Sequence, residues 1–376
     1  MILLSGPNIS GNEWKYVKKC LDTAWVSSVG SYVNKFEEMM AEFTGTKYAV
    51  ATSCGTTALH ISLMLAGVTK GDYVIVPNIT FIASVNSISY TGASPILIDV
   101  DAHTWQMDID LLENFLQTQT EIVNGHCIHK KDQRVIRAIM PVHVLGNMMD
   151  MDKLVAVAKK YCLIIVEDAT EALGSYYKNK HSGSFGLMGC FSYNGNKIIT
   201  TGGGGMIVTD NEQLAKKAKH LTTQAKADSF EYYHDEIGYN YRLVNVLAAI
   251  GVAQMEQLPN FLRRKIEIDT YYKKALSTIG DISFQEVNPN VRANQWLFTF
   301  RTKQQKKVLQ ILNEKGMQSR PFWVPMNRLP MFKNELYISD NDVSGKIYSE
   351  CLSIPCSTYI KDEELHVIAD TIKNCY

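Results

Sequence analysis

The stretch CLIIVEDA, residues 162 to 169, is an apolar run of strand length that ends on two carboxylates. Helical periodicity follows or precedes several similar runs, as in residues 57–66 and 151–161. The other apolar runs of the first two-thirds of the chain are YAVATS (48–53), DYVIVPN (72–78), SPILIDVD (94–101), IRAIMPVHV (136–144), GCFSYN (189–194) and GGMIVTD (204–210). Continuous apolar strands that alternate with helices are typical of a mostly parallel sheet covered on both faces. The sequence therefore predicts an α/β fold.

The length of the chain predicts two domains, because 376 residues exceed what one hydrophobic core usually organises. The pattern changes near Asn260, after which short strands and helices continue to the last residue. The elements expected there are a charged helix over 261–276, a strand over 295–302 and a helix over 304–315. We therefore expect a large domain over residues 1–255 and a smaller α+β domain over residues 256–376.

The charge balance excludes a large electrostatic footprint. Lys and Arg together number 38, and so do Asp and Glu, which leaves a formal net charge of zero. Neither a nucleic acid nor an anionic membrane is therefore an expected partner. No apolar run is long enough to cross a bilayer, and the first residues, MILLSGPNIS, show no secretory signal.

The cysteines and histidines predict a reduced, cytoplasmic protein without a metal site. None of the eight cysteines forms a C-x-x-C pair, and their spacing suits no disulfide framework. His126, Cys127 and His129 lie together in a polar insertion, residues 118–135. Because no second ligand pair follows at zinc spacing, we interpret this group as a polar hairpin tip.

Polar side chains that could take part in catalysis or ligand binding follow several of the expected strands. Asp168 ends one strand, and Lys197 follows another after a glycine. Gly55-Thr56-Thr57 joins the first strand to the beginning of a helix. An open α/β sheet binds its ligands at the carboxyl ends of its strands, so these groups are expected to meet at one edge. Each of these features alone is weak evidence for a ligand site, because acids at strand ends, lysines and glycine runs are common in proteins.

Taken together, these residues fit pyridoxal phosphate. A helix N-terminus with hydroxyls, at Gly55-Thr56-Thr57, suits a phosphate group. Asp168 can pair with a protonated pyridine nitrogen, and Lys197 can form an imine with an aldehyde. Ser192 adds a hydroxyl donor toward the phosphate, and Phe81 offers a stacking face to an aromatic ring.

The order of these motifs along the chain resembles the DegT/StrS family of nucleotide-sugar aminotransferases. The stretches that carry the resemblance are WVSSVG (25–30), GTTAL (55–59), EDA (167–169), FSYNGNK (191–197), TTGGGG (200–205), GYNYRL (238–243) and RPFWVP (320–325). The resemblance spans essentially the whole chain. It implies the aspartate aminotransferase (type I) fold with a mostly parallel central sheet, and a homodimer with shared active sites.

The resemblance also implies roles for single residues at the cofactor. By this resemblance, Lys197 is the lysine that forms the imine with the cofactor, and Asp168 is the partner of the pyridinium nitrogen. Thr56, Thr57 and Ser192 become phosphate ligands, and Phe81 becomes the stacking residue. Asn240 is similar to the family residue that reaches the phosphate from the neighbouring subunit.

One position departs from the family pattern. Many members carry Gln or His three residues after the aspartate and facing the cofactor, whereas this chain has Glu171. A second carboxylate beside Asp168 must either be protonated or meet a compensating cation.

The resemblance implies a specific reaction. The chain is expected to transfer an amino group, with L-glutamate as donor, to C4 of a nucleotide-linked 4-keto-6-deoxy sugar. WVSSVGSYV (25–33), EALGSYY (171–177) and NGNKIITTGGGGMIV (194–208) are similar to the legionaminic-acid branch, which implies a UDP-linked 2-acetamido sugar for bacterial surface-glycan or nonulosonic acid synthesis. Candidate substrate residues are Trp25, Ser27, His143, Arg242 and Arg320. His143 has an equally good interpretation as a hydrogen-bonded structural histidine.

Other functions remain open from the sequence. A regulator that binds pyridoxal phosphate without turnover would need the same pocket. A sugar dehydratase of the same family would carry His where this chain has Lys197. A dinucleotide oxidoreductase lacks its fingerprint, because the first strand leads into SCGTTA (53–58) and not into G-x-G-x-x-G.

Overall fold

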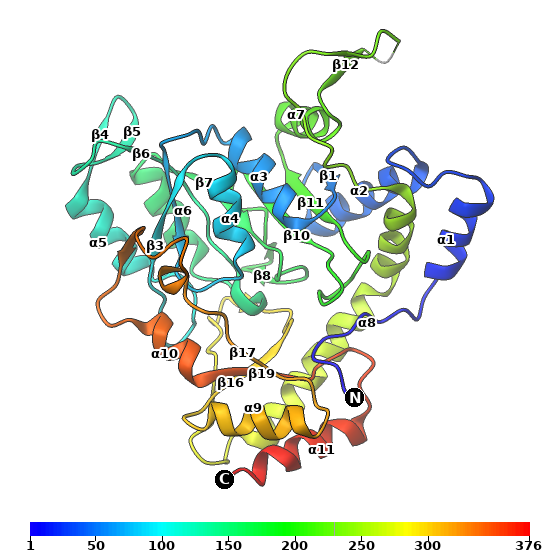
Figure 1. Cartoon of the computed structure of the whole chain (residues 1–376), viewed down its shortest axis with the longest axis vertical. Helices are drawn as coiled ribbons and strands as arrows, with labels where there is room; N and C mark the ends of the chain where they lie inside the picture. Colours follow the sequence, from blue (N-terminus) through cyan, green and yellow to red (C-terminus); the bar gives the residue numbers. More distant parts are fainter. Residues whose placement is uncertain (229) are drawn as a thin grey trace.

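The computed structural model describes residues 1–228 and 230–376. Its centre is a sheet with the strand order β1-β11-β10-β7-β6-β2-β3-β18, which forms the upper part of the molecule in Figure 1. These strands are β1 (Tyr48–Thr52), β2 (Tyr73–Pro77), β3 (Ser94–Ile98), β6 (Val135–Ile139), β7 (Ile164–Asp168), β10 (Met188–Ser192), β11 (Gly205–Thr209) and β18 (Leu336–Ile338). Only β11 runs antiparallel to its neighbours in this order, β1 and β10. The predicted α/β fold with a mostly parallel sheet is confirmed.

Helices cover both faces of this sheet because both faces are apolar. In β2, Val74 and Val76 belong to one buried cluster, whereas Tyr73 and Ile75 belong to another. The first cluster contains α3 (Gly55–Leu65) and α4 (Ala83–Tyr90), and the second contains α5 (Ile109–Gln119) and α6 (Met151–Lys160). The remaining helices of this part are α1 (Glu13–Asp22), α2 (Ser31–Thr44) and α7 (Glu212–Thr222). Neighbouring residues of one strand thus pack into opposite clusters, as the continuous apolar runs predicted.

The polar insertion at residues 118–135 is a hairpin at the rim of the sheet. Its strands β4 (Thr120–Val123) and β5 (His126–His129) pair with each other, and β5 also pairs with the beginning of β6. The ring Nδ1 of His129 lies 2.8 Å from Asp132 Oδ1, whereas Cys127 is buried. The segment is a hairpin, but His126, Cys127 and His129 form its second strand and not a polar tip, because Cys127 and His129 are buried.

The C-terminal part has a core of its own. Its sheet has the order β14-β16-β19-β17, and α9 and α11 pack with the end of α8 in a third buried cluster. The elements are α8 (Asn245–Leu276), β14 (Ser283–Phe284), β15 (Val291–Arg292), β16 (Phe298–Arg301), α9 (Gln305–Glu314), β17 (Arg320–Pro321), α10 (Val343–Glu350), β19 (Cys351–Ile354) and α11 (Asp362–Lys373). Smaller strands elsewhere are β8 (Tyr176–Tyr177), β9 (Lys180–His181), β12 (Lys226–Asp228) and β13 (Tyr233–His234), and short 3-10 turns lie at Val144–Gly146 and Met326–Arg328.

The junction between the two parts differs from the expectation. Helix α8 is one 32-residue helix that includes Pro259, so the expected boundary at residue 256 falls inside it (Figure 1). The helix continues past the proline because Leu258 and Phe261 pack into the first cluster while Ile268 and Tyr272 pack into the third. The packing on both sides compensates for the hydrogen bond that proline cannot donate.

Asp99, directly after β3, fastens the C-terminal part to the large sheet. Its buried carboxylate accepts hydrogen bonds from the backbone N–H and hydroxyl of Ser344, from the N–H of Val343 and from the hydroxyl of Ser339. Burial by itself would raise the pKa of Asp99, but these hydrogen bonds outweigh it, and the pKa lies below its ordinary value.

We expect Asp99→Asn to destabilise the protein by about 2–4 kcal/mol at neutral pH, because buried donors lose a charged acceptor. A carboxylate whose pKa is depressed by folding contributes stability above its unfolded pKa of about 3.9, and this stability is lost as the pH falls through the folded pKa. The difference between variant and wild type in urea unfolding should therefore shrink in acid. A difference that is constant with pH would contradict the role of the charge.

Candidate active site

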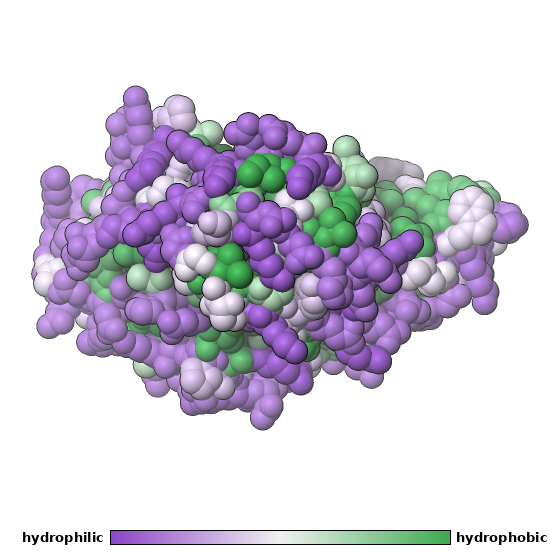
Figure 2. All heavy atoms as spheres, turned by 90° about the horizontal axis from the view of Figure 1, so that it is seen from below, coloured by the Kyte–Doolittle hydropathy of each residue, from purple (hydrophilic) through white to green (hydrophobic). Residues whose placement is uncertain are grey.

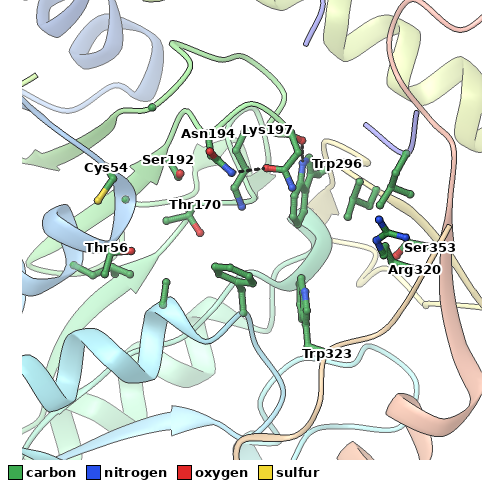
Figure 3. Close-up of a pocket in the computed structure, with 18 of the residues that line it drawn as sticks. Cys54, Thr56, Thr170, Ser192, Asn194, Lys197, Trp296, Arg320, Trp323 and Ser353 are labelled. Carbon is green, nitrogen blue, oxygen red and sulfur yellow. Dashed lines mark hydrogen bonds between the residues drawn. The ribbon is translucent and has the colours of Figure 1, made fainter. Parts of the chain in front are cut away.

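A cavity of about 410 Å³ lies at the carboxyl ends of β1, β10 and the strands next to them. Figure 3 shows Thr56, Thr170, Ser192 and Lys197 on one side of it, and Trp296, Trp323 and Arg320 on the other. The first group follows strands of the large sheet, whereas the second group comes from the C-terminal part of the chain. The cavity therefore lies between the sheet edge and the segments that cross above it.

Lys197 lies in the loop that connects β10 with β11, and its side chain is only 11% exposed. Its Nζ lies 3.8 Å from Glu171 Oε1 and 3.9 Å from the ring centroid of Trp296. Burial lowers the pKa of Lys197, although the negative charges of Glu171 and Asp168 oppose this effect. A lysine in such a setting reaches its neutral, nucleophilic form more easily than a solvated lysine does.

Glu171 is buried three residues after the end of β7. Burial raises its pKa to about 7, while the charge of Lys197 and the hydrogen bond from the N–H of Leu145 (2.8 Å) act in the opposite direction and Asp168 adds to the increase. The sequence required that this second carboxylate be protonated or compensated. The structure provides the compensating cation, Lys197, and a carboxyl group that takes up a proton near neutral pH.

Asp168, the last residue of β7, is buried beside these two groups. Its Oδ2 accepts a hydrogen bond of 2.6 Å from the hydroxyl of Ser84, and its Oδ1 accepts one of 3.1 Å from the N–H of Thr170. These bonds hold the carboxylate in one orientation at the end of its strand. A fixed negative charge at this place suits a cationic ring nitrogen.

The first turn of α3 and the end of β10 meet very closely. A Cβ atom on Gly55 would lie 2.8 Å from Cβ of Ser192, so only glycine permits this approach. Thr56 and Ser192 line the cavity, and the first N–H groups of a helix have no partner within the helix. The hydroxyl of Thr57 instead donates to the carbonyl oxygen of Cys54 at 2.8 Å and does not line the cavity.

Aromatic side chains form the walls of the cavity. Phe81, which lies between β2 and α4, meets Trp323 at a centroid distance of 6.4 Å. Trp323 in turn stacks on Trp296 at 6.5 Å with an angle of 23° between the rings. Trp296, Trp323 and Thr170 line the cavity but were not among the predicted site residues, whereas Arg320, which also lines it, was predicted. No motif marks Trp296, because its place at Lys197 depends on how two distant segments pack.

The other sequence candidates lie outside this cavity, except for Arg320. His143 is fully buried, with Nε2 placed 2.9 Å from Glu167 Oε2, which favours its structural interpretation. Arg242 makes a buried ion pair of 2.7 Å with Glu37. It lines a separate cavity of about 560 Å³ together with Trp25.

Ser27 and Asn240 also lie away from the cavity of their own chain. The carbonyl oxygen of Ser27 accepts a 2.6 Å hydrogen bond from the N–H of Asn245 at the start of α8. Asn240 is exposed and does not line the cavity. The expected role of Asn240 requires a second subunit, and the roles of Asn240 and Ser27 both stay predictions.

The residues at the cavity fit pyridoxal phosphate. Lys197 lines the cavity and can supply an amine for its aldehyde, and Asp168, which is buried beside Lys197 and outside the lining, can supply a carboxylate for its ring nitrogen. Thr56 and Ser192 line the cavity where a helix begins, which is the place for the phosphate, and the face of Phe81 is available to an aromatic ring. Fold and site together define an enzyme that uses pyridoxal phosphate.

Comparison with known proteins identifies the family. The chain belongs to the DegT/DnrJ/EryC1/StrS aminotransferase family, whose profile matches residues 7–373. The GDP-perosamine synthase of Escherichia coli O157:H7 is 38% identical over 373 residues, which is 98% of this chain and 97% of the relative. The GDP-perosamine synthase of Caulobacter vibrioides is 39% identical over 370 residues, 97% of this chain and 95% of the relative.

A solved structure agrees with this assignment at the level of the fold. A DegT DnrJ EryC1 StrS aminotransferase from Brucella abortus has a TM-score of 0.89 and 24% identity, and the match covers 96% of this chain and 95% of that chain. The predicted fold, the cofactor pyridoxal phosphate and the enzyme class, a sugar aminotransferase, are confirmed. The relatives do not single out the legionaminic-acid branch, which stays a prediction.

We expect Glu171→Gln to shift the pH dependence of cofactor capture to lower pH. The amide removes a negative charge that stabilises the ammonium form of Lys197, so the pKa of Lys197 should fall further. Absorbance after cofactor-free protein is mixed with pyridoxal phosphate, followed across a pH series, measures the midpoint. Glu212→Gln, which removes an exposed partner of Lys216, is the matched control. A midpoint that stays in place or rises would contradict the coupling between Glu171 and Lys197.

Proposed function

We propose that this chain transfers an amino group from L-glutamate to C4 of a nucleotide-linked 4-keto-6-deoxy sugar. The observation that carries the proposal is the buried amine of Lys197, which faces a cavity with aromatic walls and with Arg320 in its lining. The aromatic faces of Trp296 and Trp323 suit the apolar side of a deoxy sugar. A guanidinium group suits a diphosphate or a carboxylate.

The chain's own residues would perform the proton chemistry. Pyridoxal phosphate, when bound, supplies a conjugated ring that accepts the electron pair of the bond broken at the donor carbon. Among the described residues, Lys197 is the only lysine that lines the cavity, and its lowered pKa suits a group that removes and returns a proton. Asp168 would maintain positive charge on the ring nitrogen, and Glu171, whose pKa burial raises to about 7, could take up or release a proton near neutral pH.

The nucleotide is proposed from the relatives. Two curated relatives at 38% and 39% identity are named GDP-perosamine synthases, which favours a GDP-linked substrate for this chain. The UDP-linked 2-acetamido sugar of a legionaminic-acid route, implied by stretches such as WVSSVGSYV (25–33), is the alternative. In both cases the product is an amino sugar for a surface glycan, and the cytoplasmic location stays a prediction. None of the helices in the described residues combines the length and hydropathy that a bilayer crossing requires.

We also propose the predicted homodimer with shared active sites. The surface around α1 exposes large apolar side chains, among them Trp14 (78%), Val29 (68%) and Leu21 (59%). Figure 2 shows hydrophobic surface toward this end of the molecule. Apolar patches of this kind mark interfaces. Val29 lines the same cavity as Arg242 and Trp25, and Asn240 pairs with Thr223, which also lines it. We expect the second copy to bind over these residues.

We expect Lys197→Ala to lower turnover at least a hundredfold, because it removes the group that moves the proton. Formation of 2-oxoglutarate from glutamate, and mass spectrometry of the sugar product, measure the two halves of the reaction with GDP- and UDP-linked 4-keto-6-deoxy sugars. Borohydride should trap the cofactor on the peptide that contains Lys197. Lys216→Ala, on an exposed helix face, is the control. Turnover of simple keto acids with none of the keto sugars would refute the proposed acceptor.

If the active sites are shared, two variants that are each inactive as homodimers should regain activity in mixed dimers. If Asn240 serves the site of the partner subunit, a Lys197→Ala chain mixed with an Asn240→Ala chain should restore roughly a quarter of the sites after random exchange, because one of the two sites in each mixed dimer is intact. Sedimentation measures the oligomer, and turnover before and after exchange measures the recovery. A fully active monomer, or a mixture that gains nothing, would count against shared sites.

A further inference from the structure

Lys265, in the middle of α8, is a buried cation whose hydrogen-bond partners are all uncharged. The residue is 2% exposed. Its Nζ donates to the carbonyl oxygens of Trp296 and Cys356, both at 2.7 Å, and lies 3.4 Å from Cys356 Sγ. Removing an ammonium group from water is costly, and these neutral acceptors repay only part of that cost. Such a residue calls for an explanation beyond general packing.

Hydrogen bonds hold the backbone of Trp296, one of the two acceptors of Lys265, on both its N–H and its carbonyl oxygen. Its N–H donates to Asn294 Oδ1 at 3.0 Å, and Nδ2 of Asn294 donates to the carbonyl oxygens of Glu171 (2.8 Å) and Leu173 (2.9 Å). Lys265 holds the carbonyl oxygen of Trp296 from the opposite side. The backbone of Trp296 therefore has little freedom to move relative to the Glu171 loop.

Trp296 in turn holds the loop of Lys197. Its indole Nε1 donates a 2.7 Å hydrogen bond to the carbonyl oxygen of Asn196, and its ring centroid lies 3.9 Å from Lys197 Nζ (Figure 3). The carbonyl oxygen of Asn196 belongs to the peptide unit that leads into Lys197. Any shift of the indole would therefore move both the backbone and the amine of Lys197.

We propose that Lys265 is a positioning residue that acts through Trp296 on the amine of Lys197. The ammonium group of Lys265 donates hydrogen bonds to the backbone of two separate segments of the C-terminal part, one at Trp296 and one at Cys356. These bonds fix the position of the Trp296 indole against Lys197. Neutral donors would hold two carbonyl oxygens less strongly than a cation does. This inference relies on the proposal that Lys197 carries the cofactor.

The test is the affinity of cofactor-free protein for pyridoxal phosphate, followed by the absorbance of the bound cofactor. Lys265→Met keeps the length of the side chain and removes its charge. We expect about tenfold weaker binding, the size of one lost hydrogen bond to a charged group, and a shifted absorbance maximum. Lys274→Met, an exposed position of the same helix, should bind as wild type does.

A double-mutant cycle separates positioning from general destabilisation. Trp296→Phe removes the indole donor, so adding Lys265→Met to it should weaken cofactor binding no further, although each substitution alone does. Thermal unfolding is measured in parallel, and Lys265→Gln, with a neutral amide donor, replaces Lys265→Met if that variant does not fold. Additive losses, or a folded Lys265 variant with wild-type affinity and absorbance, would overturn the proposal. If Lys197→Ala still captured the cofactor covalently, the assignment of Lys197 would fail instead, whatever the Lys265 variants do.

Discussion

The site depends on one interaction, the buried contact between the amine of Lys197 and the carboxyl group of Glu171. Two ionisable groups 3.8 Å apart in a buried place each alter the charge of the other, and burial shifts both toward their neutral forms. Burial therefore favours a neutral amine and a protonated acid, whereas the attraction between the two charges favours the ion pair. An enzyme that must both bind an aldehyde and move a proton with the same amine needs this balance.

The parallel sheet provides the conditions for that contact. Strands that run in the same direction deliver their carboxyl ends to one edge, so β7 brings Asp168 and Glu171 to the place where β10 brings Ser192 and the Lys197 loop. The antiparallel β11 returns the chain after this loop. Its first residue, Gly205, passes so close to Cys54 that a Cβ atom would lie 2.4 Å from the carbonyl oxygen of that residue. The glycine run thus permits the close approach of the Lys197 loop to the start of α3.

The C-terminal part completes the site from the other side. Helix α8 packs into the buried clusters of both parts, and Asp99 fastens the segment around Ser344 to the large sheet. Trp296 and Trp323 line the cavity opposite the sheet edge, and the ring centroid of Trp296 lies 3.9 Å from the amine of Lys197. The two cores therefore cooperate in one site, although each one is formed from its own hydrophobic cluster.

The sequence by itself determined the elements that depend on local pattern. Apolar runs of strand length predicted the central sheet, and residues that end those runs, Asp168 and Ser192, were placed correctly at its edge because parallel strands leave no other arrangement. Lys197 was recognisable from its distance to Ser192 and from its motif. Tertiary structure decided the rest: Arg242 pairs with Glu37, and Trp296 meets Lys197 across about a hundred residues of chain. Those contacts depend on which surfaces pack together, and side-chain partners that are far apart in sequence leave no periodic or local signal that a single chain can reveal.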